Sequence, residues 1–299
     1  MKLTRDNFQE LLTPIHVKII GRSYKEKELQ YPKIFKVDKM RKKEETFPHI
    51  GDLSAWRENT EGNTINEDQM SQGPTAKFVA RRFDNGYTVT WELVKDDLYG
   101  VFNGRGVDGS ARGLGRGLRT TEETEAANVI NNGFTNVGYD GVPLFASNHP
   151  LEDSSDVLDN LATGALTPAN LKTAMTKMRN QVNGAGHKIQ ARADQLIVGP
   201  DLEFTAKEIV GSNLQAHELS NTKNVIEGLK VIVMDYIEGD IWVIRDSSYE
   251  NLAFLVREKE WFDSQKLPKT VDFFVFGFKR FDVGYYDYRG LVGSAGAGA

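Results

Sequence analysis

The stretch D-G-V-P-L-F-A-S-N-H-P, residues 140–150, brings an acid, a serine and a histidine close together in the chain. Asp140, Ser147 and His149 are the side-chain types of a serine-hydrolase triad. A nucleophilic serine, however, usually stands at a tight elbow such as G-x-S-x-G, and A-S-N-H-P is not one. Ser147 and His149 are also only two residues apart, a spacing that does not aim a ring nitrogen at the hydroxyl as a triad requires.

The turn residues of the same stretch favour a different interpretation. Asp140 and Gly141 form a turn signal, V-P-L-F is typical of a short apolar strand, and N-H-P ends that strand. We therefore interpret residues 140–150 as a structural connection rather than a catalytic site, and expect the protein not to be an enzyme. A serine-type hydrolase that uses Ser147 and His149 stays the alternative from a different functional class.

The composition is that of a folded protein without thiol chemistry. Of the 299 residues, 39% are hydrophobic and 26% are charged, which is the balance of a globular chain. The absence of cysteine excludes disulfides, cysteine-ligated zinc, iron–sulfur clusters and thiol nucleophiles. The five histidines have no ligand-spaced partners, so we expect neither a metal nor a cofactor. No apolar run is long enough to span a membrane and no export signal is visible, so we expect residence in a cytoplasm.

Charge is unevenly distributed along the chain. Residues 1–43 hold 12 basic and 5 acidic residues, a net charge of +7, whereas the remainder holds 25 basic and 37 acidic residues, a net charge of −12. A helix signal over residues 4–13 ends at Pro14, and residues 15–45 alternate loosely, which indicates an extended arm. The basic run Lys39, Arg41, Lys42 and Lys43 is either a solvated segment or a contact to something anionic, such as nucleic acid or an acidic neighbour.

Residues 46–91 predict a long two-stranded excursion with a polar tip at 58–75. D-N-G at 84–86 is a hairpin-grade turn signal within it. Residues 92–132 then carry a helical period that is interrupted by seven glycines, which favours a long helix that is kinked or broken between about 100 and 117. Gly104, Gly106 and Gly109 match G-x-G-x-x-G, but no strand precedes them, so we interpret them with Gly113 as a flexible joint rather than a nucleotide site.

The second half predicts a mixed α+β fold with mostly meandering strands. Thr167 caps and Pro168 opens the clearest helix, at 167–184, which Gly184 is expected to end. A further short helix is expected at 202–210. Strands are expected at 195–200, 229–234, 241–244, 252–256 and, with many aromatic residues, 271–290. These aromatic residues are more typical of an alternating core strand than of a platform that stacks bases.

The arm, the long excursion and the interrupted helix cannot bury their apolar faces within one chain. Such elements favour an obligate assembly of copies.

The order of these features resembles the major capsid proteins of tailed phages, the family with the Hong Kong 97 fold, and looks closest to Mu-like major head subunits. Similar subunits carry a D-G-x-P-L-F-x-x-x-H-P stretch after their long helix, which 140–150 matches. W-V-I-R-D at 242–246 and Y-D-Y-R-G at 286–290 form a second match.

The resemblance implies a division of the chain. Residues 1–45 would be the N-arm, 46–91 the extended β-hairpin loop that lies over a neighbour, and 92–150 the peripheral domain with its spine helix. Residues 151–260 would form the axial domain, and 261–299 would return to the peripheral domain and end in a tail.

The resemblance also implies a function and partners. The chain would be a structural subunit of an icosahedral virion shell that forms hexamers and pentamers around double-stranded DNA after assembly in the host cytoplasm. Its partners would be copies of itself, portal, scaffold and decoration proteins, and DNA held by non-specific electrostatics, without a membrane. The alternative within this fold is an encapsulin-like nanocompartment shell.

Overall fold

Two four-stranded sheets organise the protein. The computed structural model describes residues 9–68, 72–90, 92, 109–151, 156–211, 226, 228–270 and 272–296. The long sheet has the order β1-β10-β11-β4, with bounds Lys36–Lys39, Leu252–Lys266, Phe273–Tyr285 and Arg81–Val89. The short sheet has the order β12-β9-β7-β8, with bounds Leu291–Ser294, Trp242–Arg245, Gln195–Val198 and Lys230–Val233. The mixed helix and sheet content confirms the predicted α+β class.

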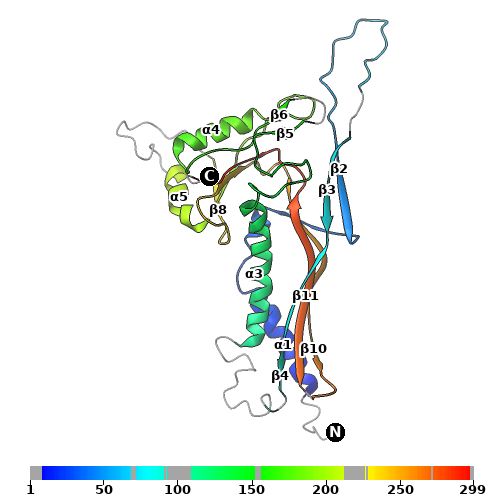
Figure 1. Ribbon diagram of the computed structural model, residues 1–299, viewed down its shortest axis with the longest axis vertical. Coiled ribbons are helices and arrows are strands. Elements are labelled where there is room, and N and C mark those ends of the chain that lie inside the picture. The colour runs from blue at the N-terminus through cyan, green and yellow to red at the C-terminus, as the bar shows by residue number, and fades with distance from the viewer. Residues whose placement is uncertain are drawn as a thin grey trace.

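Helices α1 (Gln9–Tyr24) and α3 (Ser110–Asn131) run along one face of the long sheet (Figure 1). Side chains of a strand alternate between the two faces of its sheet. On β11, Val275 and Phe281 lie on the face that carries the helices, and both are buried there. From α1, Ile20 packs into the same cluster as Val275. A 3₁₀ turn, η2 (Tyr31–Lys33), follows α1 and leads into β1.

The expectation that Pro14 ends the first helix is wrong. Helix α1 continues through Pro14 to Tyr24, and its second half packs on α3, so residues 15–24 are not an extended arm. A proline inside a helix removes one backbone hydrogen bond and costs about 3 kcal/mol. The burial of Ile20 and Tyr24 in tertiary contacts offsets that cost.

The expected break in the second helix is also wrong from Ser110 onward. Helix α3 is continuous from Ser110 to Asn131 and includes Gly113, Gly115 and Gly117. The part of the expected break before residue 109 lies outside the described residues. Gly115 has a packing role, because a Cβ there would lie 2.5 Å from the carbonyl oxygen of Ile20 on α1. The missing side chain thus lets the two helices approach closely.

Two glycine substitutions separate packing from helix propensity. Gly115→Ala is expected to lower the melting temperature, because α1 must shift away from the new Cβ. Gly113→Ala is the matched control, since a Cβ there meets nothing within 4 Å, and it is expected to raise stability by up to about 1 kcal/mol. Thermal unfolding of both variants checks this. Equal stabilisation by the two would show that α1 does not rest on Gly115.

Strands β2 (Glu44–Ile50) and β3 (Gln72–Val79) form an antiparallel ribbon that projects beyond the sheets (Figure 1). The described residues 51–68 form its distal loop, so a two-stranded excursion is present, but it ends at Val79 rather than at 91, because residues 81–89 belong to the long sheet. D-N-G at 84–86 is not a turn, however. These residues lie inside β4, where Gly86 pairs with Phe276 and Asn85 with Gly277 of β11. The continuous ladder with β11 outweighs the local turn preference.

The short sheet is covered on both faces. Leu196, Val198, Trp242 and Ile244 pack against helices α4 (Pro168–Arg179) and α5 (Glu203–Gly211). Ile197 and Val243 point the other way, into the core shared with the long sheet. The Thr167 side chain accepts a hydrogen bond from the Asn170 backbone, which confirms the predicted cap. The helix ends at Arg179 rather than at Gly184, and a 3₁₀ turn, η3 (Pro200–Leu202), precedes α5.

Two strands belong to a different sheet from the one that the expected domain boundaries imply. Strand β10 enters the long sheet at Leu252, inside the range expected to be axial. Strand β12 joins the short sheet through β9, although residues 261–299 were expected to return to the other domain. A single core cluster contains Phe254 and Phe281 of the long sheet and Ile197 of the short sheet. The two sheets therefore meet through continuous packing.

Candidate assembly surfaces

The stretch 140–150 joins the two sheets, and its acid and histidine do meet. His149 Nδ1 lies 2.6 Å from Asp140 Oδ2, and both side chains are buried. His149 Nε2 lies 3.2 Å from the Leu144 carbonyl oxygen and 3.1 Å from Asn160 Oδ1, and its ring stacks on Tyr288 at 3.8 Å. Both ring nitrogens are thus occupied by oxygen partners inside the protein.

Ser147 is not part of this cluster. Its side chain is exposed, whereas His149 is fully buried and its second nitrogen faces Asn160. The backbone N–H of Ala146 donates to Asn160 Oδ1 at 2.9 Å, which fixes the orientation of that amide. In a triad, this second nitrogen would face the serine hydroxyl. The arrangement therefore holds a loop in shape and does not activate a nucleophile.

Phe145 connects the end of α3 to the short sheet. Its backbone N–H donates to the Gly133 carbonyl at 2.8 Å, and a Cβ on Gly293 of β12 would lie 2.7 Å from its ring. V-P-L-F is not a strand as expected: within it Pro143 makes an isolated antiparallel bridge with Val137, and the strand of this stretch is His149–Pro150, β5, which pairs with β6 (Val157–Leu158). Burial of Leu144 and Phe145 in the shared core replaces strand pairing.

A buried charged cluster fastens the N-terminal segment to the long sheet. Lys279 Nζ of β11 lies 2.6 Å from Glu122 Oε1 of α3, and both side chains are buried. The Tyr24 hydroxyl donates to Glu122 Oε2 at 2.8 Å and the Tyr31 hydroxyl donates to the same oxygen at 3.3 Å. The neighbouring Glu123 accepts the backbone N–H groups that follow α1. The cluster links three segments that are distant in the sequence.

Electrostatics make this cluster sensitive to the loss of a partner. Burial raises the pKa of Glu122, and the Lys279 ammonium partly opposes that rise. Burial likewise raises the pKa of Tyr24, with a further contribution from the Glu122 carboxylate beside it. Both shifts have desolvation of the charged form as their main cause. Sequence reasoning missed the cluster, because an E-E pair in a helix and a lysine in an aromatic strand resemble solvated surface charges.

The four basic residues Lys39, Arg41, Lys42 and Lys43 come together at the turn between β1 and β2. The backbone N–H groups of Arg41 and Lys42 donate to Glu45 Oε1, and the Arg257 guanidinium donates to the Arg41 carbonyl at 2.6 Å. All four side chains are exposed, and no ion pair joins them to another residue in the described ranges. Glu45 and Arg257 thus hold the backbone of the turn by hydrogen bonds, while its four cationic side chains stay exposed.

Of the four glycines expected to form a flexible joint, only two are described. Gly109 immediately precedes α3 in an extended conformation, and Gly113 lies in the first turn of that helix. Gly104 and Gly106 lie outside the described residues. The structure therefore brings Gly109 and Gly113 to the helix start.

The distal loop of the β2–β3 ribbon exposes large apolar side chains. Trp56 is fully exposed, Ile65 is 87% exposed and Leu53 is more than half exposed, as is Ile50 at the end of β2. A loop of this size normally places such residues against a surface. The available sequence signal was Trp56 directly before the polar tip expected at 58–75.

The aromatic strand β11 divides its side chains between two faces. Phe281 lies in the core, as expected for an aromatic core strand, but Phe274, Phe276 and Phe278 are only half-buried on the opposite face. Trp261 of β10 joins them and is 45% exposed. We call Trp261, Phe274, Phe276 and Phe278 the aromatic row.

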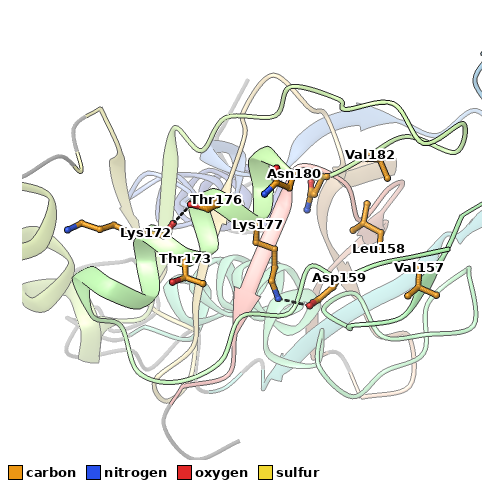
Figure 2. Close-up of a pocket in the computed structure, with 10 residues that line it drawn as sticks. Val157, Leu158, Asp159, Lys172, Thr173, Thr176, Lys177, Asn180 and Val182 are labelled. Carbon is orange, nitrogen blue, oxygen red and sulfur yellow. Dashed lines mark hydrogen bonds and ion pairs between the residues drawn. The ribbon is translucent and has the colours of Figure 1, made fainter. Parts of the chain in front are cut away.

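A groove of about 590 Å³ runs along α4 (Figure 2). Lys177 Nζ lies 2.7 Å from Asp159 Oδ2 across it and also donates to the Leu161 carbonyl. Leu158, Lys172 and several valine, threonine and amide side chains complete the lining. In the described ranges, no three metal-ligating side chains gather, and no helix is long and apolar enough to cross a membrane.

A family model described as phage capsid protein matches residues 75–294, from β3 to the end of β12. The chain belongs to the phage capsid protein family. The match includes α3, the 140–150 junction, the whole short sheet and strands β4, β10 and β11 of the long sheet, and leaves out β1. No protein with a curated description matches the chain.

Solved capsids share the fold of this phage capsid protein. The capsid chain of cyanophage P-SCSP1u has a TM-score of 0.58 and 11% identity, covering 89% of this chain and 87% of that chain. The capsid of bacteriophage JBD30, decorated with minor capsid protein trimers, has a TM-score of 0.56 and 17% identity, covering 71% and 92%. A virus-like particle from Pyrococcus furiosus has a TM-score of 0.51 and 14% identity, covering 95% and 98%.

These matches confirm the Hong Kong 97-like fold and the role of a phage capsid subunit, a structural component of the virion. They point to a structural rather than a catalytic protein. A closer relationship to Mu-like head subunits stays a prediction.

Proposed function

We propose that this capsid protein is the major subunit of an icosahedral shell and assembles into hexamers and pentamers around double-stranded DNA, without catalysing a reaction. The observation that carries the proposal is the projecting β2–β3 ribbon, whose distal loop exposes Trp56, Ile65 and Leu53, which no described part of the chain covers. A closed shell needs heterologous contacts, in which one surface of a subunit meets a different surface of the next. A projecting apolar loop is suited to that kind of contact.

We propose that the long sheet with α1 and α3 forms the peripheral domain and that the short sheet with α4 and α5 forms the axial domain near capsomer centres. The ribbon would lie over one neighbour. Helix α1 packs on α3 of its own chain, so the N-arm contact to another copy is proposed only for the residues that precede it. Portal, scaffold and decoration proteins would complete the head in the host cytoplasm.

Electron microscopy of the purified protein tests the proposal directly. Closed shells or free hexamers and pentamers are the expected particles, and monodisperse monomers at high concentration would contradict it. Nuclease-protected double-stranded DNA in particles from infected cells would separate a virion shell from an encapsulin-like compartment, whose shell would hold an enzyme instead.

We also propose that Lys39, Arg41, Lys42 and Lys43 contact packaged DNA or an acidic neighbour, because their exposed cations have no ion-pair partner among the described residues. DNA contact is electrostatic, so affinity should fall steeply with salt, and replacing the four by glutamine should flatten that dependence. An unchanged salt slope would assign them to solvent or to a protein neighbour.

Gly104, Gly106, Gly109 and Gly113 are proposed as a flexible joint between shell states, at and before the start of α3. The same backbone path through these residues in every subunit copy and in both precursor and mature shells would exclude that role.

A further inference from the structure

Helix α4 and the loop that follows it carry basic residues without acidic ones. Residues 160–193 contain no acidic residue, in a chain whose net charge is −5. Their five basic residues are Lys172, Lys177, Arg179, Lys188 and Arg192. Helix α4 covers the side of the short sheet that faces away from the long sheet (Figure 1). This end of the molecule therefore has a local charge opposite to that of the whole chain.

Two cavities adjoin each other around the C-terminal half of α4. The first is the groove of about 590 Å³ that Lys177 crosses (Figure 2). The second has a volume of about 450 Å³, and among its lining residues are Arg179, Lys188 and Arg192. Thr176 and Asn180 line both cavities. We call the two cavities together the α4 track.

Three cations of the second cavity lack a countercharge. Arg179, Lys188 and Arg192 are exposed, and none of them forms an ion pair within the described ranges. Lys188 Nζ donates to Asn180 Oδ1 at 3.0 Å, a neutral acceptor that orients the ammonium without cancelling its charge. No carboxylate of the described residues lines this cavity. The cavity is thus suited to an anion supplied from outside the subunit.

The loop that carries two of these cations has a fixed backbone. Gln190 has a φ of 57°, and within the described ranges no other non-glycine residue has a positive φ. On one side of it, the Tyr249 hydroxyl donates to the Ile189 carbonyl at 2.8 Å, and on the other the Arg192 backbone N–H donates to Asp246 Oδ2 at 2.7 Å. A left-handed non-glycine residue persists only where its surroundings fix it, and such residues concentrate at ligand-binding positions.

The first cavity adds an apolar edge to the α4 track. Val157 of β6 is 58% exposed there, with Leu158 and Val182 beside it. Duplex DNA presents a convex row of phosphates without apolar groups, so it fits neither the concave shape nor this edge. An extended peptide can place carboxylates and apolar side chains at separate points along its length. The combination of cations and an apolar edge therefore favours a peptide over nucleic acid.

We propose that the α4 track binds an acidic peptide segment of a partner protein. Its carboxylates would contact Arg179, Lys188 and Arg192, and an apolar side chain would lie against Val157. Guanidinium groups hold carboxylates through paired, charge-assisted hydrogen bonds. The inference goes beyond the proposed shell function, because it assigns a partner surface that lies within one subunit and requires no closed shell.

Fluorescence anisotropy with full-length, unassembled subunits tests the proposal. The probe is a short labelled peptide of alternating glutamate and leucine. The site variant combines Arg179→Gln, Lys188→Gln and Arg192→Gln, and should weaken binding about tenfold or more. The matched control removes the same charge at another exposed site, through Arg41→Gln, Lys42→Gln and Lys43→Gln, and should leave binding nearly unchanged. All six side chains are exposed, so both variants should melt like the parent protein.

The outcomes separate a specific site from general attraction. Equal weakening in the two variants, or no saturable binding by the parent protein, would overturn the proposal. A labelled DNA duplex that binds more tightly than the peptide, and loses that binding in the site variant, would assign the α4 track to nucleic acid instead. Val157→Ser should also weaken the glutamate–leucine peptide and leave a glutamate–serine peptide unaffected. Loss of both peptides would show that the apolar edge takes no part.

Carbodiimide coupling gives an independent readout, because the reagent joins peptide carboxylates to nearby lysine amines. Mass spectrometry should place the coupled peptide mainly on Lys188, and much less on Lys42 and Lys43, which are equally exposed in class but lie outside the track. Peptide spread evenly over the exposed lysines would contradict a defined site. Closed shells seen by microscopy together with this result would leave the shell function intact and remove only the partner surface.

Discussion

Replacing His149 by alanine is expected to lower the free energy of unfolding by about 3–5 kcal/mol, because the change leaves a buried carboxylate without its partner. Asp140 has 1% side-chain exposure, and its carboxylate lies 2.6 Å from the His149 ring. The variant also loses the stacking contact with Tyr288 and leaves the buried Asn160 with one partner fewer. Chemical denaturation of unassembled subunits measures the loss.

The matched control is Ser147→Ala in the same stretch. Its side chain is exposed and outside the hydrogen-bond cluster, so the change should stay within about 0.5 kcal/mol. Assembly should be normal for Ser147→Ala and impaired for His149→Ala. Equal losses for the two would contradict the architectural role, and hydrolysis that Ser147→Ala abolishes would revive the serine-hydrolase alternative.

Replacing Lys279 by methionine is expected to cost about 3–5 kcal/mol as well, because Glu122 then remains buried without a countercharge. The change should also loosen the N-terminal segment, since Tyr24 and Tyr31 reach the sheet through Glu122. Earlier proteolytic cleavage within the first 35 residues would report that loosening. The exposed pair of Lys36 with Glu250 supplies the control, and Lys36→Met should cost at most about 1 kcal/mol.

The pH dependence of the Lys279→Met variant has a definite sign. Burial raises the pKa of Glu122 above its ordinary value, and Lys279 opposes that rise, so removing the lysine raises the pKa further. The folded variant then holds a proton more tightly than the unfolded chain, and its stability increases as the pH falls through the folded-state pKa. The deficit should therefore shrink as the solution is acidified from neutral pH. A deficit that grows on acidification would show that Glu122 is not the uncompensated group.

Adding Glu122→Leu to Lys279→Met should recover much of the loss. Replacing both members of a buried pair with apolar side chains leaves no charge to desolvate. The tyrosine hydroxyls would lose an acceptor, so recovery should be incomplete.

Much of the architecture was accessible from local patterns. Thr167 and Pro168 mark the start of α4, the apolar run at 195–198 becomes β7, and the polar tip expected at 58–75 overlaps the distal loop, although β2 ends earlier, at Ile50, and β3 begins at Gln72. The interpretation of 140–150 as a structural element rested on its turn residues and on the spacing of Ser147 and His149. Each of these signals acts over a few neighbouring residues, so the sequence alone carries it.

Other features depended on contacts between distant segments. Pro14 and D-N-G at 84–86 are local stop signals, yet α1 continues because it packs on α3, and β4 continues because β11 pairs with it along its length. The glycines of α3 suggested a break in the helix, but the missing side chain of Gly115 lets α1 pack closely against α3.

By itself, the sequence determined the α+β class, the absence of thiol chemistry, the projecting ribbon and the resemblance to capsid subunits. Only the tertiary structure decided that Asp140 meets His149, that Lys279 meets Glu122, and that the aromatic residues of β11 divide between a core and an open face. Those pairings join residues up to 157 positions apart. Their free energy comes from burial and desolvation that exist only once the two sheets and their helices have come together.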